Sequence, residues 1–506
     1  MTSPTPTSES VSRRTTLTVT AGTLAARFTE LVGDGHRLAL VAGHDDVDAL
    51  RVVYLFLRGG SDDRVELVLH ADHTTPEIPS LSAQSFTAGR FEREVADLFG
   101  VVALGHTFPR RLVHHQHWPD GWHPLRRDAG PTPPIDETRD PFPFVTVEGP
   151  GVYEIPVGPV HAGLIEPGHF RFSVVGETII TMKARLWFVH KGIEKLFEGR
   201  HITTGVELAE RISGDTAVGH NLAYCLAVEE ALGVEVPPTG QYLRALLLEL
   251  ERLYNHAADI GALANDVGYG ILHAHASRIR EQLLRMNSRV TGQRLLRGSI
   301  VPGGVHVRGL PDPAELTAIA EDLAEVADLA LANSTVVDRF AGTSILPADA
   351  ALQLGTLGPV ARASGIDIDA RRDHPFVDLS EPLHVVRHDT GDVHARFCVR
   401  RDEFAASIQL IHWLIEQLAA RHGQPAAVPL PPVRRPASGV GIAEGWRGTI
   451  VHRVEIEPCG KLTRVKIVDP SFFNWPALPV ALADTIVPDF PLTNKSFNLS
   501  YAGNDL

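Results

Sequence analysis

Two proline-rich stretches do most to limit how this chain of 506 residues can fold. The first includes Ala129–Pro134 and Pro141–Pro143, and the second covers Pro425–Pro436. Proline fixes φ and lacks a backbone N–H, so such stretches interrupt helices and sheets. We therefore expect four regions: a disordered Ser/Thr/Pro-rich tail at 1–16, a small domain at 17–128, a linker at 129–150 and a large domain at 151–506. The second stretch separates a helical middle from a C-terminal segment.

Hydrophobic patterning differs between the two domains. In the small domain it predicts strands at Leu38–Ala42, Val52–Leu57 and Val65–Leu69. In the large domain it predicts a strand hairpin around Val174–Ile180 and long helices over Tyr242–Leu263, Pro313–Arg339 and Asp402–His422, with Gly423 as the last C-cap. The expected fold class is α+β: a small N-terminal α+β domain, a Pro-rich linker, and a large domain dominated by a helical bundle with peripheral β-strands.

Composition excludes several classes of function. The net charge is −14 and no long Lys/Arg run appears, which argues against a nucleic-acid partner. The cysteines Cys225, Cys398 and Cys459 form no CxxC pair, which fits a reducing cytoplasm. Three thiols also fall short of the four that usually hold an iron–sulfur cluster. No apolar run approaches the roughly 20 residues that span a bilayer, so any membrane attachment is expected through partners.

Several short sequence motifs resemble those of a known family. They are Phe91–Gly100, Arg110-Arg111, His123–Asp128, Gly158–His161, Glu166–Phe172, Phe188–Lys195, Glu249–His256, Arg297–Val305 and Glu444–Gly448. The first three resemble the small docking subunit of the peripheral arm of respiratory complex I (NADH-quinone oxidoreductase). The others resemble its quinone-module subunit and the large subunit of hydrogenase-4/formate-hydrogenlyase-type membrane complexes, the group 4 [NiFe] hydrogenase-like proteins. The resemblance spans roughly residues 35 to 506.

Four positions depart from the hydrogenase pattern. The family's nickel–iron centre is held by cysteines in Arg-x-Cys-x-x-Cys and Asp-Pro-Cys-x-x-Cys words. Here those positions are Ser213, Thr216, Ser500 and Gly503. The resemblance therefore implies that the soft thiolate ligands of nickel are absent, and we expect no metal. The complex I quinone tyrosine is also missing, because its position falls on Gly214.

The resemblance also suggests a polar site. Glu194 matches a hydrogenase carboxylate used in proton transfer, and a buried carboxyl has a raised pKa that suits this role. A structural ion pair of Glu194 with Lys191 or Lys195 is the alternative. Either of two histidines can match the quinone-binding histidine of complex I. The expected lining of the cavity is His161, His169, Glu194, Asp215, His220 and Arg447.

The resemblance implies a function within a larger assembly. We expect an oxidoreductase subunit that takes part in electron transfer from an iron–sulfur cluster of a small partner subunit, with quinone as a candidate acceptor, coupled to ion translocation. Antiporter-like integral membrane subunits are the other expected partners, and the location is the cytoplasmic face of the membrane. The chain alone is expected to hold no cofactor, and NAD enters only through the wider complex. The alternative is a non-redox scaffold or proton-path subunit.

Overall fold

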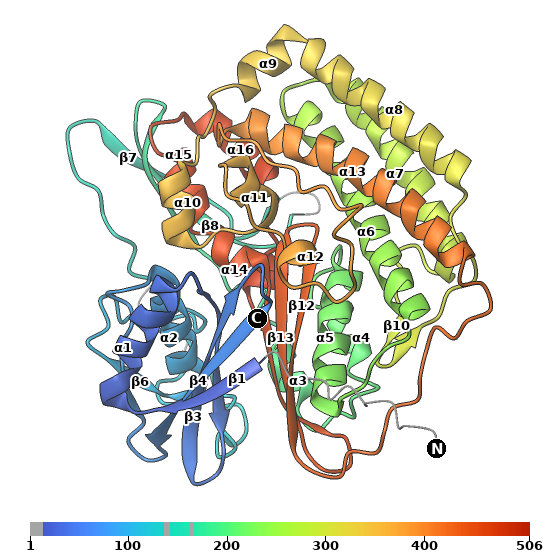
Figure 1. Cartoon of the computed structure of the whole chain (residues 1–506). Helices are drawn as coiled ribbons and strands as arrows, with labels where there is room; N and C mark the ends of the chain where they lie inside the picture. The colour runs from blue at the N-terminus through green and yellow to red at the C-terminus, as the bar shows by residue number, and fades with distance from the viewer. Residues whose placement is uncertain (1–13, 136–141, 162–164) are drawn as a thin grey trace, which may run out of the picture.

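The structure is a computed structural model that describes residues 14–135, 142–161 and 165–506. An N-terminal domain lies on one side of a three-stranded sheet, and long helices lie on the other side (Figure 1). The α+β fold class is confirmed, with a small β-rich domain followed by a largely helical one.

The N-terminal domain is built on a four-stranded sheet of order β1-β4-β3-β2. β1 runs parallel to β4, and the remaining neighbours are antiparallel. The three predicted strands are confirmed as β2 to β4. Its elements are β1 (Arg14–Val19), α1 (Ala21–Gly33), β2 (Arg37–Asp45), β3 (Ala49–Arg58), β4 (Asp63–Asp72), β5 (Glu77–Pro79), α2 (Phe86–Phe99) and β6 (Val102–Leu104).

The tail predicted at residues 1–16 was extended too far toward the C-terminus, because β1 begins at Arg14. Residues 1–13 lie outside the described residues, but Arg14 already pairs with Arg64 at the start of β1. The Arg14 guanidinium also contacts Glu66 at 3.0 Å and Glu230 at 2.8 Å. These long-range contacts order Arg14–Thr16, which a count of Ser, Thr and Pro cannot detect.

The C-terminal sheet consists of β12 (Ala437–Gly445), β13 (Gly448–Ile456) and β14 (Leu462–Val468), all antiparallel. It is buried between α5 (Ala217–Leu232) and the N-terminal domain, whereas the sequence suggested peripheral strands. Gly441 explains how closely β12 approaches α5, because a Cβ at this position would overlap the carbonyl oxygen of Ala223.

Buried charges join the N-terminal domain to this sheet. Arg453 on β13 donates its Nε to Glu66 of β4 at 2.8 Å, and both side chains are almost fully buried. Arg51 of β3 donates to both carboxylate oxygens of Glu455, at 2.8 and 2.9 Å. Removing one partner of such a pair leaves an uncompensated buried charge. The two domains are therefore held in a fixed relative position.

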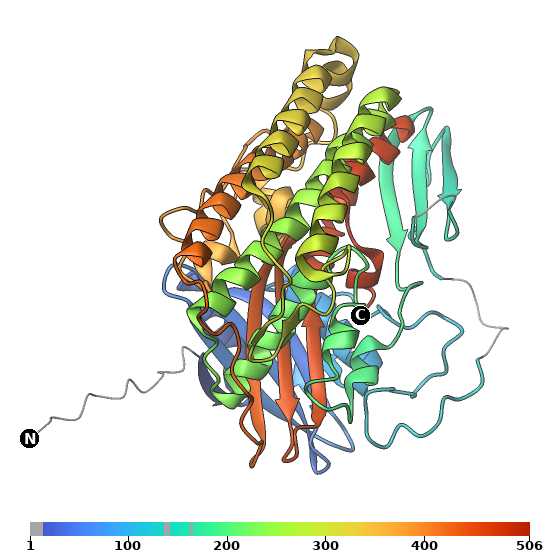
Figure 2. The same ribbon diagram turned by 90° about the vertical axis from the view of Figure 1, so that its right-hand side faces the viewer.

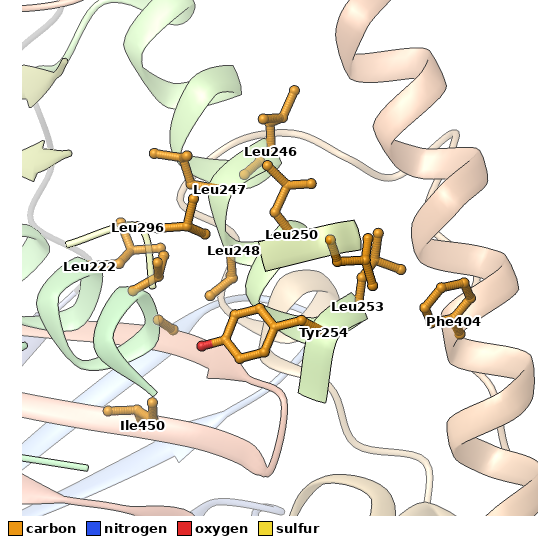
Figure 3. Close-up of a cluster of buried hydrophobic side chains, with 14 of the residues drawn as sticks. Leu222, Leu246, Leu247, Leu248, Leu250, Leu253, Tyr254, Leu296, Phe404 and Ile450 are labelled. Carbon is orange, nitrogen blue, oxygen red and sulfur yellow. The ribbon is translucent and has the colours of Figure 1, made fainter. Parts of the chain in front are cut away.

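The helical layer contains the largest elements of the chain. α6 lies at its centre, and Leu246, Leu250 and Leu253 point into a cluster shared with Phe404 and Ile450 (Figure 3). This spacing of three and four residues is the apolar face predicted from the sequence. The long helices are α6 (Pro238–Asp266), α7 (Gly270–Thr291), α8 (Pro313–Ala332) and α13 (Val393–Ala419).

Two predicted helices have different limits in the structure. The segment predicted as one helix to Arg339 is broken at Asn333, whose extended backbone and side chain cap α9 (Ser334–Phe340). The helix expected from Asp402 begins nine residues earlier, where Asp392 accepts a hydrogen bond from the Ala395 N–H. It ends at Ala419, so Gly423 is not its C-cap.

A second antiparallel sheet, β7-β8-β9, stands beside the C-terminal helices (Figure 2). The predicted hairpin is confirmed as the β8–β9 turn. The remaining elements are β7 (Val152–Val157), β8 (His169–Val175), β9 (Thr178–Arg185), α3 (Ile193–Phe197), α4 (Val206–Ala209), β10 (Ile300–Val301), β11 (Gly304–Val305), α10 (Ala348–Leu354), α11 (Gly358–Ala363), α12 (Ala370–Asp373), α14 (Pro470–Asn474), α15 (Ala477–Leu482), a 3-10 turn (Val487–Asp489), α16 (Phe490–Phe497) and α17 (Tyr501–Asn504). Within the described ranges, no helix is long and apolar enough to cross a bilayer.

Candidate functional site

The four positions at which the resemblance places nickel ligands lie close together in the structure. Ser213 and Thr216 lie in the turn before α5, and Ser500 is the N-cap of α17. The hydroxyls of Ser213 and Ser500 are 2.9 Å apart although the residues are far apart in sequence. Ser500 also accepts a hydrogen bond from the Gly503 N–H at 2.9 Å. The turn and the C-terminal helix therefore form one polar site.

An ion pair occupies the centre of this site. Arg447, from the β12–β13 turn, binds both oxygens of Asp215 at 2.6 and 2.7 Å. The guanidinium also donates to Thr216 Oγ1 at 3.2 Å and stacks over the Trp446 ring at 3.9 Å. Burial by itself raises the pKa of Asp215, but Arg447 and the hydroxyl donors lower it to about 2. Asp215 is therefore ionised at neutral pH, and it orients Arg447.

The site opens to the surface at Asp215. The Asp215 side chain is 38% exposed, whereas Arg447 beside it is 6% exposed. Ser213 and Ser500 are buried behind it. Another molecule can therefore reach the carboxylate edge of the pair, while the guanidinium is shielded from water.

The fourth ligand position has no room for a side chain. A Cβ at Gly503 would lie 2.5 Å from Cγ of Asp469, the N-cap of α14. Asp469 also bonds His220 Nε2 at 3.0 Å, and His220 Nδ1 lies 3.1 Å from His452 Nε2. His220 is thereby connected to the site through Asp469. The carboxylate thus occupies the space into which a Gly503 side chain would extend.

These residues do not suit a nickel–iron centre. Ser and Thr hydroxyls are not thiolates at neutral pH, and Gly503 offers no side chain. Burial raises the pKa of the Cys225 thiol well above its usual value and that of Cys398 to about 11. Over residues 14–135, 142–161 and 165–506, no group of three or more His, Cys, Asp or Glu side chains is arranged to hold a metal ion.

Glu194 lies in a different cluster. It receives Arg464 at 2.7 Å, Lys466 at 3.2 Å and the Ile467 N–H at 3.0 Å, all from β14. Burial alone raises the pKa of Glu194, but Arg464 and Lys466 reverse this and lower it. The expected raised pKa is therefore wrong. An ion pair is present, but neither predicted lysine provides it.

The predicted lysine partners of Glu194 have other contacts. Lys195 pairs with Glu198 at 2.6 Å, and Lys191 donates to the carbonyl oxygen of Ile212 at 3.1 Å. The cluster instead extends into the N-terminal domain, where Lys466 binds Glu94 of α2 at 2.5 Å. Burial, and repulsion from Glu194, raise the pKa of Glu94.

Of the two candidate quinone histidines, His161 lies in the connection between β7 and β8, and His169 is the first residue of β8. His161 Nε2 is 2.8 Å from the carbonyl oxygen of Gly168, and His169 Nδ1 is 3.0 Å from that of Gly158. Each ring nitrogen thus contacts the backbone of this connection. The connection packs on α17, because a Cβ at Gly168 would lie 2.6 Å from the Tyr501 ring. The histidines therefore adjoin the C-terminal side of the site, but they are not hydrogen-bonded to Arg447 or Asp215.

Comparison with known proteins shows the family to which the chain belongs. Three family models match: "Respiratory-chain NADH dehydrogenase, 30 Kd subunit" over residues 18–134, "Nickel-dependent hydrogenase" over 191–261 and "Respiratory-chain NADH dehydrogenase, 49 Kd subunit" over 266–434. Formate hydrogenlyase subunit 5 of Escherichia coli (strain K12) is 32% identical over 93% of this chain and 85% of its own length. The chain belongs to this family of hydrogenase and complex I subunits.

Other members of the family show the same relationship. Hydrogenase-4 component G of Escherichia coli (strain K12) is 31% identical over 92% of this chain and 83% of its own length. An NADH-quinone oxidoreductase subunit from Bacteroides fragilis (strain YCH46) is 30% identical over 79% of this chain and 80% of its own length. The solved structure of an archaeal membrane-bound sulfane sulfur reductase, described as a respiratory membrane complex, aligns with a TM-score of 0.65 at 26% identity, covering 70% of this chain and 99% of its matched chain.

Sequence reasoning about the family missed several residues of the two clusters. Asp469, His452, Glu94, Arg464 and Lys466 were not among the predicted site residues. Asp469-Pro470 has the N-cap and N1 pattern of a helix start, which could have located the residue but not its contact with Gly503. The other four lie on regular strands or a helix, where no local pattern distinguishes them.

Proposed function

We propose that this chain is a subunit of a membrane-associated, complex I-related oxidoreductase and takes part in electron transfer without a nickel–iron centre of its own. Its electrons come from an iron–sulfur cluster in a small partner subunit. Quinone is the proposed class of acceptor, and ion-translocating, antiporter-like membrane subunits are the proposed coupled partners. The subunit then sits peripherally at the cytoplasmic face of the membrane.

The observation that carries this proposal is the Asp215–Arg447 pair in place of the metal. The four ligand positions of the hydrogenase relatives form an oxygen-based network around this pair, and Asp469 fills the fourth position. The Arg447 guanidinium donates to Asp215, Thr216 and the carbonyl oxygen of Asn498, so its proposed effect on a reduced acceptor is that of a fixed positive charge beside the site. The resemblance places the quinone tyrosine of complex I at Gly214, so a side-chain donor is missing there, and Arg447 is the proposed source of positive charge at this site.

The test uses the complex purified with its partner subunits. We expect no stoichiometric nickel after chelation and no hydrogen-dependent dye reduction. After chemical reduction of the iron–sulfur clusters, a short-chain quinone should reoxidise them, as followed by electron paramagnetic resonance. Arg447→Gln should slow this reoxidation.

The matched control is Arg285→Gln. Arg285 lies on the surface of α7, where its side chain is 71% exposed, and this change should leave the rate unaltered. Retained nickel together with hydrogen-dependent dye reduction would return the chain to the active hydrogenases. If the quinone does not reoxidise the clusters, the scaffold alternative is supported, and equal rates in the Arg447→Gln complex and the wild type would remove Arg447 from the proposed site.

A further inference from the structure

A buried network of charged side chains links the helical layer to the central sheet, and its positive and negative groups are unequal in number. Its members are all at most 6% exposed. They are Glu249, Arg252 and His256 of α6, Arg362 of α11, Asp369 and Arg371 at α12, Glu403 of α13 and Glu444 of β12. Three guanidinium groups face four carboxyl groups, so the network carries one excess negative charge if His256 is neutral and every carboxyl is ionised. An uncompensated charge at this depth is costly.

The surrounding charges do not correct this excess. Arg37 of β2 lies on the outer side, near Glu444 and Asp373, and Arg372 binds both Asp373 and Asp367. These outer groups comprise two guanidinium groups and two carboxylates, so together they add no net charge to offset the excess. On the other side of the network, Arg400 is paired with Asp259 at 2.6 Å. One proton must be held inside the network to restore neutrality.

His256 is poorly placed to hold this proton. Its Nε2 is 2.8 Å from Glu403, but its Nδ1 is buried without a hydrogen-bond partner. Protonation would turn Nδ1 into a buried donor with no acceptor, which is more costly than a buried lone pair. Burial also lowers the pKa of His256.

Three of the carboxylates are strongly held in the ionised form. Asp369 receives Arg371 through two nitrogens, at 2.6 and 3.0 Å. Glu249 receives Arg371 at 3.1 Å and Arg252 at 3.1 Å. Glu403 receives Arg362 at 2.5 Å. The pKa of each is lowered by these guanidinium groups against the effect of burial.

Glu444 differs from the other three. One oxygen contacts a single nitrogen of Arg362 at 3.0 Å, and that nitrogen is shared with Asp369 and a carbonyl oxygen. The other oxygen accepts hydrogen bonds from two neutral groups, the Ala370 N–H at 3.0 Å and Thr449 Oγ1 at 2.8 Å. A hydroxyl can accept a hydrogen bond as well as donate one. Thr449 can therefore accept a hydrogen bond from a protonated Glu444. Burial, with repulsion from Asp369, raises the pKa of Glu444.

We propose that Glu444 is a buried proton-holding site, carrying the proton that balances this network, with Thr449 accepting its hydrogen bond. The site adjoins the Asp215–Arg447 pair along the chain. Arg252 donates to the carbonyl oxygens of Glu444 and Gly445, at 2.8 and 3.3 Å, in the end of β12 that leads to Arg447. This proposal does not depend on the redox function proposed above.

The test is infrared spectroscopy of the full chain at neutral pH. A protonated carboxyl has a C=O stretch separate from the carboxylate bands. We expect Glu444→Gln to remove one such band. Glu251→Gln is the matched control, because burial raises the pKa of this second carboxyl to about 8 and its band should be a different one. An unchanged protonated-carboxyl region in the folded Glu444→Gln protein would overturn the proposal.

One further measurement keeps the proposal testable if Glu444→Gln folds poorly, and a second compares the stability of the folded variants. Thr449→Val removes the proposed acceptor, so the Glu444 band should shift to higher frequency, and an unshifted band would contradict the assignment. Thermal melts give the second measurement. An amide replaces a neutral carboxyl with little change in charge, so the Tm of Glu444→Gln should stay near that of the wild type. Glu249→Gln removes an ionised group and should lower the Tm by several degrees; equal losses in both variants would count against a neutral Glu444.

Discussion

Replacing Lys466 with methionine tests the cluster that contains Glu194. The Lys466 ammonium is 3% exposed and bridges Glu94 at 2.5 Å and Glu194 at 3.2 Å, so its loss leaves two buried carboxylates facing each other. Methionine keeps most of the side-chain volume, which limits any cavity. Breaking a buried pair by removing one partner costs about 3–5 kcal/mol. We expect a loss of this size in the free energy of unfolding at neutral pH.

The loss in the free energy of unfolding of Lys466→Met should depend on pH in a defined direction. Without Lys466 the pKa of Glu94, which burial already raises, rises further above the unfolded value of about 4.3, and the pKa of Glu194 is lowered less than before. A group with a raised folded pKa loses stability as pH increases from the unfolded pKa through the folded one. The deficit of Lys466→Met should therefore shrink as the solution is made acidic and grow toward neutral pH.

The assay is urea unfolding of the full chain followed by tryptophan fluorescence at several pH values. Lys195→Met is the matched control, because Lys195 is 46% exposed and its pair with Glu198 lies at the surface. A surface pair contributes about 0–1 kcal/mol. If the two variants lose similar stability at neutral pH, or if the deficit of Lys466→Met does not shrink in acid, the reasoning about a buried bridge is refuted.

Three other changes have defined outcomes. Asp215→Asn leaves Arg447 without its carboxylate; because Asp215 is partly exposed, we expect a loss of only about 1 kcal/mol in a thermal melt, with slower quinone-dependent reoxidation. Gly503→Ala brings a Cβ to within 2.5 Å of Asp469 and should cost about 1–3 kcal/mol; an unchanged Tm would mean that the helix shifts freely. The folded pKa of Glu251 is about 8, so it destabilises the fold as pH rises toward that value, and Glu251→Gln should flatten this part of the profile of Tm against pH.

The parts of the fold predicted from the sequence are those with a local periodic signal. The strands β2 to β4 and the helix α6 repeat apolar residues at spacings of two or of three and four, and both patterns are read within one element. The first turns of α13 lack this signal, since they contain Arg396 and Arg400. Both arginines are buried, because Ser496 and Asp259 bind them from distant segments. A short sequence window shows only that these two residues are charged. It therefore predicts that α13 begins later in the chain.

The residues of the candidate site were likewise predicted only where a local sequence motif contains them. The turn around Ser213 and Thr216 and the C-terminal Ser500 were found because they lie within recognisable words, and the structure brings them together. The partners of Glu194 were missed, since Lys466 lies 272 residues away on another element. An ion pair depends on tertiary approach, which leaves no spacing pattern in the sequence.

The contact between Asp469 and Gly503 has a consequence for the history of the chain. A single mutation that returned cysteine to position 503 would meet the carboxylate of Asp469 before its sulfur could serve a metal. The other three positions would still carry Ser213, Thr216 and Ser500, so nickel binding could not offset the strain. A single substitution to cysteine at position 503 is therefore disfavoured on its own. A thiolate site for nickel would therefore need coordinated substitutions at several positions together with a displacement of Asp469.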